Sequence, residues 1–408
     1  MNQDPFKSMY GISDTVVSMA DEAMTTVSSV FSKIEEVREY NQLRVLQAFR
    51  NARFAEAHLG STTGYGYDDI GREKIEQMYA EIFGAEAAYV RIQVTCGTQI
   101  LVACLFGILK PGEEMLAVTG RPYDTLASAL GVEKKEEGFT GSLLDYGMKY
   151  NEVQLLSDGS PDLEAIKAAI KPETKVVFLQ KSKGYTSRRC LRADDIKTVV
   201  DLVKGIREDI IVFVDNCYGE FVEKQEPCAL GADLCAGSLI KNAGGGICPS
   251  GAYVAGRKEL VERVAERVTA PGLGSHVGPS LGFNRQIAQG LFMAPHVVAE
   301  AMKGAVFAAK LLEMAGCRCE PSSSDLRGDI VQSVAFPDEQ QMVNFCRKVQ
   351  SCSPASSPPR AARPRRWRDS KVYPPPGSFR LSPEVFLVSR VCRAWQTPLR
   401  ERESRGRG

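Results

Sequence analysis

Histidine is scarce in this chain of 408 residues, and no two cysteines form a Cys-x-x-Cys pair. The three histidines are His58, His276 and His296, and the twelve cysteines are scattered apart from Cys317 and Cys319. A structural zinc site needs four Cys or His ligands at short, regular spacings. The sequence therefore predicts no metal site, and its scattered cysteines favour reduced thiols in the cytoplasm over a disulfide framework.

The N-terminus also lacks the apolar run of a secretory signal peptide. Residues 1–18 carry acidic and polar side chains where such a peptide would be hydrophobic. No segment is judged long and apolar enough to span a bilayer. With 44% hydrophobic and 25% charged residues, the composition is that of a globular protein with a sizeable core. We therefore expect a cytoplasmic protein without a membrane partner.

Charge is distributed unevenly along the chain, although the net charge is only +1. Residues 351–408 contain 13 Lys and Arg against 4 Asp and Glu, so this tail carries +9 and residues 1–350 carry −8. The tail also holds nine of the 21 prolines and both tryptophans, and it has no helix or strand periodicity. It is either a disordered basic tail or a segment translated out of frame, and the abrupt change favours the second. The acidic main body needs no nucleic-acid partner.

Strands and helices alternate through the middle of the chain. This alternation predicts βαβ units and therefore an α/β fold with a mostly parallel sheet. We divide the chain into an N-terminal helical segment (1–60), a large domain (61–284), the start of a C-terminal domain (285–349) and the anomalous tail (350–408). The predicted strands are 88–94, 115–118, 176–180, 210–215 and 252–255, and the predicted helices are 13–57, 72–83, 100–109, 194–206, 258–268 and 285–316.

Lys241 and Asp215 are the residues that most strongly indicate chemistry. Asp215 ends an apolar strand, and Lys241 follows in Ser-Leu-Ile-Lys-Asn, just before three glycines. Taken singly, they fit a turn aspartate and a solvated lysine. Together they suit pyridoxal phosphate, with the lysine forming a Schiff base and the aspartate keeping the pyridine nitrogen protonated. Burial beside the cationic ring would lower the pKa of Lys241.

Gly97 and Thr98 lie between an apolar strand and an apolar helix. Backbone N–H groups at such a helix start form an anion site, although an ordinary strand–helix turn with a Thr cap fits as well. Ser238 and Lys241 also match the Ser-x-x-Lys signature of penicillin-recognising enzymes. That interpretation requires Ser-Asp-Asn and Lys-Thr-Gly partners, and neither tripeptide occurs.

Two tyrosines are further candidates for the site. Tyr123 follows a strand and is placed to stack on a flat cofactor, although packing is the commoner role of a tyrosine. Tyr65 lies in a loop rich in glycine and tyrosine that also contains Tyr67 and precedes Arg72. This cluster suits a phosphate contact or plain loop packing.

The chain resembles the fold-type I pyridoxal-phosphate enzymes of Cys/Met metabolism. More narrowly, it resembles the bacterial methionine gamma-lyase or cystathionine beta-lyase family proteins, also called aluminium resistance proteins. The resemblance covers roughly residues 5–349 and is carried by five stretches in the expected order. They are Thr-Thr-Gly-Tyr-Gly-Tyr-Asp-Asp-Ile-Gly-Arg (62–72), Arg-Ile-Gln-Val-Thr-Cys-Gly-Thr (91–98), Val-Thr-Gly-Arg-Pro-Tyr-Asp-Thr-Leu (118–126), Val-Asp-Asn-Cys-Tyr-Gly-Glu (214–220) and Gly-Ser-Leu-Ile-Lys-Asn-Ala-Gly-Gly-Gly (237–246).

The resemblance implies a role for each candidate residue. Lys241 would be the Schiff-base lysine and Asp215 the partner of the pyridine nitrogen. Tyr123 would stack on the ring and help to protonate the leaving sulfur. Tyr65 would reach a neighbour's site in a dimer of dimers. The phosphate would be held by Gly97, Thr98 and Ser238.

Two departures from the family pattern stand out. Cys96 occupies a position where the family has serine, and its backbone N–H remains usable. The arginine that binds the substrate carboxylate normally comes from the C-terminal domain, which here reads as incomplete or aberrant. The predicted function is a carbon–sulfur lyase that removes a thiol from an amino acid by β- or γ-elimination. The alternatives are an aminotransferase, an aldolase, or a protein that binds pyridoxal phosphate without turnover.

Overall fold

The structure is a computed structural model that describes residues 9–133, 138–184, 186, 188–352 and 378–381. The chain separates into two compact units. The larger unit comprises Val37–Gly184 and Arg188–Ala299, and the smaller unit comprises residues 1–36, 185–187 and 300–408. All the candidate site residues from the sequence belong to the larger unit.

A seven-stranded sheet lies at the centre of the larger unit, with the strand order β1-β7-β6-β5-β4-β2-β3. The run from β6 to β3 is parallel, whereas β7 is antiparallel to both β6 and β1. The predicted α/β fold with a mostly parallel sheet is confirmed. The strands are β1 (Ala87–Arg91), β2 (Glu114–Ala117), β3 (Lys149–Glu152), β4 (Thr174–Gln180), β5 (Ile211–Asp215), β6 (Leu234–Ser238) and β7 (Ala252–Gly256).

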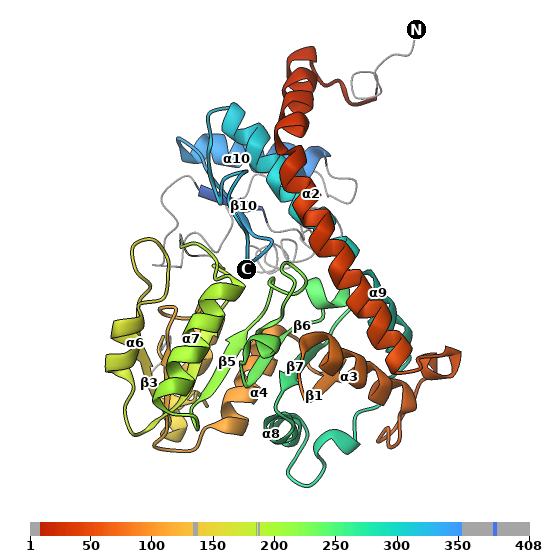
Figure 1. Cartoon of the computed structure of the whole chain (residues 1–408), viewed down its shortest axis with the longest axis vertical. Helices are drawn as coiled ribbons and strands as arrows, with labels where there is room; N and C mark the ends of the chain where they lie inside the picture. Colours follow the sequence, from red (N-terminus) through yellow and green to blue (C-terminus); the bar gives the residue numbers. More distant parts are fainter. Residues whose placement is uncertain (1–8, 134–137, 185, 187, 353–377, 382–408) are drawn as a thin grey trace, which may run out of the picture. The chain divides into compact units, whose positions relative to one another are not determined.

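Helices pack on the sheet because its central strands are apolar on both faces. Phe178 and Phe213 belong to one core cluster with the buried residues of α4 and α8. Their neighbours Val177 and Val212 are also fully buried and point to the other face, since side chains alternate along a strand. Figure 1 shows α6 and α7 lying over the sheet. The helices are α3 (Ile70–Phe83), α4 (Gly97–Ile108), α5 (Asp124–Leu130), α6 (Leu163–Ala169), α7 (Ala193–Ile206) and α8 (Lys258–Val268).

Most of the predicted elements form close to their expected bounds. The helix at 258–268 is α8, and the strands at 176–180 and 210–215 correspond to β4 and β5. The strand expected at 88–94 ends early, at Arg91, because a turn begins at Ile92. The helix expected at 100–109 begins at Gly97 instead, so Gly97 and Thr98 form its first turn.

Two long helices flank these elements in the sequence, α2 (Asp14–Asn51) and α9 (Asn284–Met314). By length and composition, α9 could cross a membrane, so the expectation that no segment reaches this threshold was wrong. Half of its most apolar stretch of 18 residues is buried inside the protein, as in a core helix. The helix continues through Pro295 without a break.

The smaller unit contains a three-stranded antiparallel sheet with the order β10-β9-β8. Its core gathers Val334, Phe336 and Met342 around partly buried residues such as Leu312 and Phe345. Within the predicted anomalous tail, residues 353–377 and 382–408 lie outside the described residues. The elements of this unit are β8 (Arg318–Glu320), β9 (Gln332–Ala335), α10 (Glu339–Cys352) and β10 (Ser378–Leu381).

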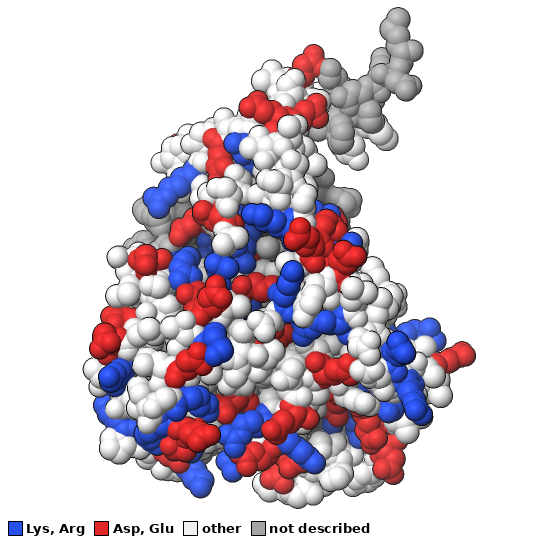
Figure 2. Space-filling view, in the orientation of Figure 1, with Lys and Arg blue, Asp and Glu red and all other residues white. Residues whose placement is uncertain are grey.

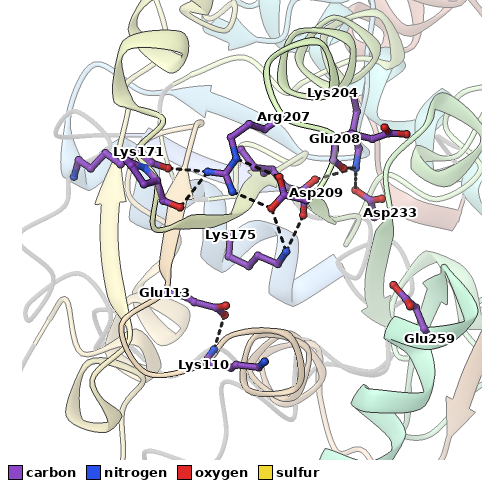
Figure 3. A network of polar contacts seen from close by, with 12 residues as sticks. Lys110, Glu113, Lys171, Lys175, Lys204, Arg207, Glu208, Asp209, Asp233 and Glu259 are labelled. Carbon is purple, nitrogen blue, oxygen red and sulfur yellow. Dashed lines mark hydrogen bonds and ion pairs between the residues drawn. The ribbon is translucent and has the colours of Figure 1, made fainter.

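Charged side chains of both signs are intermixed over the larger unit in Figure 2. At the amino ends of the strands they form the network drawn in Figure 3. Asp209, which precedes β5, is bound by Arg207 at 2.9 Å and by Lys175 at 3.4 Å. Asp233, which precedes β6, accepts a hydrogen bond from the Val212 N–H at 2.7 Å. These contacts fix the starts of β5 and β6 at the edge of the sheet opposite the predicted site.

Replacing Asp233 with alanine should lower the free energy of unfolding by about 1–3 kcal/mol, because the buried Val212 N–H loses its acceptor. The carboxylate is 7% exposed and also binds Lys204 at 2.6 Å and Arg257 at 3.3 Å. Urea unfolding measures the change. Glu259→Ala is the matched control, since it removes an exposed partner of the same Arg257 and should change stability little. Equal losses in the two variants would contradict this account.

Candidate active site

The carboxyl ends of β5 and β6 bring the predicted site residues together. Asp215 is the last residue of β5 and Ser238 the last of β6, and these strands are parallel neighbours. Lys241 follows β6 by three residues. Its backbone N–H donates to the Ser238 carbonyl at 3.3 Å, and the Ser238 hydroxyl accepts from the Ile240 N–H at 3.3 Å. Two short strand ends therefore place a carboxylate and an amine at one edge of the sheet.

Asp215 is a buried carboxylate, 3% exposed. Its Oδ1 accepts a hydrogen bond from the Cys217 N–H at 3.1 Å. Burial raises the pKa of Asp215, and the positive charge of Lys241 and the Cys217 hydrogen bond oppose that rise. A cationic nitrogen placed near this carboxylate would stabilise its ionised form.

The ammonium of Lys241 lies 4.0 Å from the centre of the Tyr218 ring. Tyr218 itself adopts a left-handed backbone conformation with φ 70°, which a tyrosine rarely does. Burial opposes the charge of Lys241, but Cys217, Tyr218 and Asp215 together raise its pKa well above the ordinary value. The protein groups alone therefore raise the pKa of Lys241, and the predicted lowering by the cationic ring of a bound cofactor stays a prediction.

Gly97 places the start of α4 beside these two strand ends. A Cβ at this position would lie 3.1 Å from the Cys217 sulfur and 3.6 Å from the Ser238 Cβ. Cys96 is the N-cap residue and makes no side-chain capping bond, so the backbone N–H groups of the first turn are left for another acceptor. The start of a 12-residue helix next to a serine hydroxyl suits a phosphate group.

Tyr123 joins the site through Thr98. The two hydroxyl oxygens lie 3.0 Å apart, and Thr98 also contacts the Thr125 hydroxyl at 3.2 Å. The Tyr123 N–H donates to Gln180, the residue paired with Asp215 across β4 and β5. Burial, and then Asp215, raise the pKa of the Tyr123 hydroxyl, so it keeps its proton at neutral pH.

The structure thus brings together Asp215, Lys241 and Tyr123 with Gly97, Thr98 and Ser238. Tyr65 is not among them, because its ring is 70% exposed and stacks on Tyr67 with the ring centres 5.5 Å apart. Lys181, in the charged loop after β4, is a buried partner of Glu223 at 3.3 Å. Gln180 and Tyr218 also lie at this site and were not predicted from the sequence. Gln180 had one sequence signal, a polar residue that ends an otherwise apolar strand.

The group fits pyridoxal phosphate in its chemistry. Lys241 offers an amine to the aldehyde, and Asp215 offers a carboxylate to the pyridine nitrogen. Gly97 leaves room for close backbone approach at the phosphate end, which a side chain between Cys217 and Ser238 would fill. These are the residues that would hold the cofactor.

Comparison with known proteins agrees with this geometry. A family model described as methionine gamma-lyase matches residues 16–365. The chain belongs to the methionine gamma-lyase family. This is a family of pyridoxal-phosphate-dependent enzymes, and the resemblance inferred from the sequence is confirmed.

Three similar proteins illustrate the range of the family and its fold. The uncharacterized protein YnbB of Bacillus subtilis (strain 168) is 46% identical over 338 residues, which cover 83% of this chain and 80% of YnbB. A carbon–sulfur lyase involved in aluminum resistance from Clostridium novyi NT is 45% identical, with a TM-score of 0.83 over 86% of this chain and 84% of that chain. The pyridoxal-5'-phosphate dependent protein YhfS from Escherichia coli is 17% identical, with a TM-score of 0.54 over 77% of this chain and 80% of that chain, and it shares the fold. The fold-type I architecture is therefore confirmed.

Proposed function

We propose that this protein is a pyridoxal-phosphate-dependent carbon–sulfur lyase that removes a thiol from a sulfur-containing amino acid by β- or γ-elimination. The observation that carries the proposal is the placement of Lys241 beside a buried Asp215 at the carboxyl ends of neighbouring parallel strands. Membership of the methionine gamma-lyase family supports it. So does the similar protein of Clostridium novyi NT, which is called a carbon–sulfur lyase.

When bound, pyridoxal phosphate supplies an electron sink for negative charge that develops at the substrate Cα. The protein residues bind and orient the reactants and move protons. Asp215 would hold a proton at the pyridine nitrogen. Lys241 would anchor the aldehyde end and, once displaced by the substrate amine, would take the Cα proton. Gly97, Thr98 and Ser238 would bind the phosphate.

Tyr123 is proposed to donate a proton to the leaving sulfur. Its raised pKa keeps the hydroxyl protonated at neutral pH, as a donor requires. Thr98 holds that hydroxyl at 3.0 Å and so orients it toward the phosphate end of the site. The same ring would stack on the cofactor.

We also propose a cytoplasmic homo-oligomer, a dimer of dimers. An exposed Tyr65 at the tip of a loop fits a residue that completes a neighbour's site rather than its own. The cofactor site would then lie between subunits. Chemical crosslinking combined with the sedimentation coefficient of the purified protein would establish the number of subunits.

The proposal is tested by the products formed from two substrates. With pyridoxal phosphate added, L-methionine and water should yield methanethiol, 2-oxobutanoate and ammonia if the enzyme performs γ-elimination. L-Cystathionine and water should yield homocysteine, pyruvate and ammonia if it performs β-elimination. Thiol and 2-oxo acid are measured in the same reaction.

Equal amounts of thiol and 2-oxo acid from either substrate support a lyase. A 2-oxo acid formed without thiol, and only when an amino-group acceptor is present, would show an aminotransferase instead. Bound cofactor without turnover of either substrate would match the alternative of a binding protein. That outcome would direct attention to the segment after residue 352.

A further inference from the structure

A buried polar network lies directly behind the two strand ends of the site. The Tyr253 hydroxyl donates to Glu220 Oε1 at 2.9 Å, and the Asn216 amide nitrogen lies 3.4 Å from the same hydroxyl. Asn216 also donates to Glu226 at 2.8 Å. The Asn242 amide donates to the backbone carbonyl of Glu220 at 3.0 Å. Because Asn216 follows Asp215 and Asn242 follows Lys241, the network connects both cofactor-binding segments.

Two acceptors in this network have no donor. Glu220 Oε2 and Asn216 Oδ1 are both buried and make no hydrogen bond. The Asn216 amide cannot be turned around, because its oxygen would then face the Glu226 carboxylate. Both side chains contact the hydroxyl of Tyr253, Asn216 through its amide nitrogen and Glu220 through Oε1, so the two residues belong to one small cluster. A single proton on Glu220 would give this cluster the donor that it lacks.

We propose that Glu220 is a positioning residue that acts as a neutral carboxylic acid. Its Oε2–H donates to Asn216 Oδ1 and holds the residue next to Asp215, while its carbonyl holds Asn242, the residue next to Lys241. The role in positioning Asp215 and Lys241 rests on the proposed function. The protonation of Glu220 does not.

The surroundings of Glu220 favour the neutral form. Glu220 and Asn216 are fully buried, so both side chains are shielded from bulk water. Burial, reinforced by the Glu226 charge, raises the pKa of Glu220 to about 8, although a hydrogen bond from its own backbone N–H, the Tyr253 hydrogen bond and the positive charge of Lys241 oppose the rise. Among the described residues, the titratable groups that interact with Glu220 include Tyr79, Cys217, Glu226, Cys235, Lys241 and Tyr253.

A neutral Glu220 predicts how the stability of the folded protein depends on pH. In the unfolded chain Glu220 loses its proton near its ordinary pKa of 4.5, whereas in the folded chain it keeps the proton up to about 8. The folded state therefore binds one more proton between these values. The stability that the protonated Glu220 contributes to the folded state is complete below about pH 4.5 and declines as the pH rises to about 8. Across that window the folding equilibrium constant should fall about tenfold per pH unit through this group.

The test compares Glu220→Gln, Glu220→Ala and wild type. Urea unfolding of the protein without added cofactor is recorded from about pH 5 to about pH 9. The glutamine is a permanently neutral isostere whose NH2 group can donate to Asn216. It should remove the part of the pH dependence of stability that comes from residue 220 and leave the protein as stable as wild type, or more so, near pH 8. Glu262→Gln, an exposed change on α8, is the matched control and should retain the wild-type pH dependence.

A second readout separates positioning from simple stability. The dissociation constant for pyridoxal phosphate is measured for each variant without urea, at a pH where that variant is folded. Glu220→Gln should bind within about twofold of wild type, and Glu220→Ala should bind about tenfold more weakly or worse, the loss expected from one unsatisfied buried group. A wild-type pH dependence in Glu220→Gln would overturn the neutral acid. Unchanged affinity in a folded Glu220→Ala would overturn the positioning role. If the alanine variant does not fold, the glutamine variant alone decides on protonation.

Discussion

Replacing Lys241 with alanine should abolish covalent attachment of pyridoxal phosphate and lower turnover by about 10²–10⁴-fold or more, the range associated with loss of a positioned proton-transfer group. Lys241 is the amine beside Asp215 at the carboxyl edge of the sheet, and its ammonium lies over the ring of Tyr218. An alanine has neither the amine that anchors the aldehyde nor a base for the Cα proton.

Mass spectrometry of the digested protein measures the covalent attachment of pyridoxal phosphate to Lys241 directly. Wild-type protein incubated with pyridoxal phosphate and reduced with borohydride should gain the mass of one reduced cofactor on the peptide that contains Lys241. The alanine variant should gain none there. Lys258→Ala, which removes an exposed lysine of α8, should label and turn over like wild type.

Added methylamine provides a further check on the Lys241 variant. A small diffusible amine can enter the space left by the side chain and should restore part of the turnover. Full thiol release by Lys241→Ala without added amine would refute the role assigned to this residue. Labelling of another lysine in the wild type would refute it independently.

Replacing Asp215 with asparagine should lower turnover by about 10²–10⁴-fold. Removing one partner of a buried ion pair costs about 3–5 kcal/mol, and every 1.36 kcal/mol is a factor of ten. Asparagine keeps the shape of the side chain but carries no charge to hold the pyridine proton. Because burial raises the pKa of Asp215, the neutral variant should be as stable to urea as wild type, or more stable.

Loss of activity without loss of stability distinguishes a functional residue from a structural one. The matched control is Asp209→Asn at the other end of the same strand, where the carboxylate is 57% exposed and bound by Arg207 and Lys175. This control should keep wild-type turnover. Wild-type turnover in Asp215→Asn would remove the carboxylate from the mechanism.

The sequence predicts those parts of the fold that depend on local patterns. β4 and β5 were predicted because each is a continuous apolar run between polar turns. β6 was missed because Leu-Cys-Ala-Gly-Ser has little apolar bulk, and its burial comes from neighbouring strands. β3 was missed because Lys-Tyr-Asn-Glu is a polar strand at the edge of the sheet. In both cases partners distant in the sequence decide the outcome.

The same distinction applies to the candidate site. Asp215 and Lys241 were predicted because each lies at a recognisable sequence signal, Asp215 at the end of an apolar strand and Lys241 just before a run of glycines. The contact between Glu220 and Tyr253 spans 33 residues, and no local pattern around either residue marks the other as its partner. A single sequence has no signal for such a pair. Only the folded sheet shows that their side chains meet beneath the site.

The amino edge of the sheet has a consequence for how this protein can evolve. Val212, whose N–H donates to Asp233, and Asp215 are three residues apart on β5, which is about 10 Å along the strand. Changes at that separation usually add without coupling. Better ion pairing at the amino edge can therefore compensate for destabilising mutations that retune substrate preference at the carboxyl edge. Residues around the site can therefore change while the amino ends of the strands keep the scaffold in place.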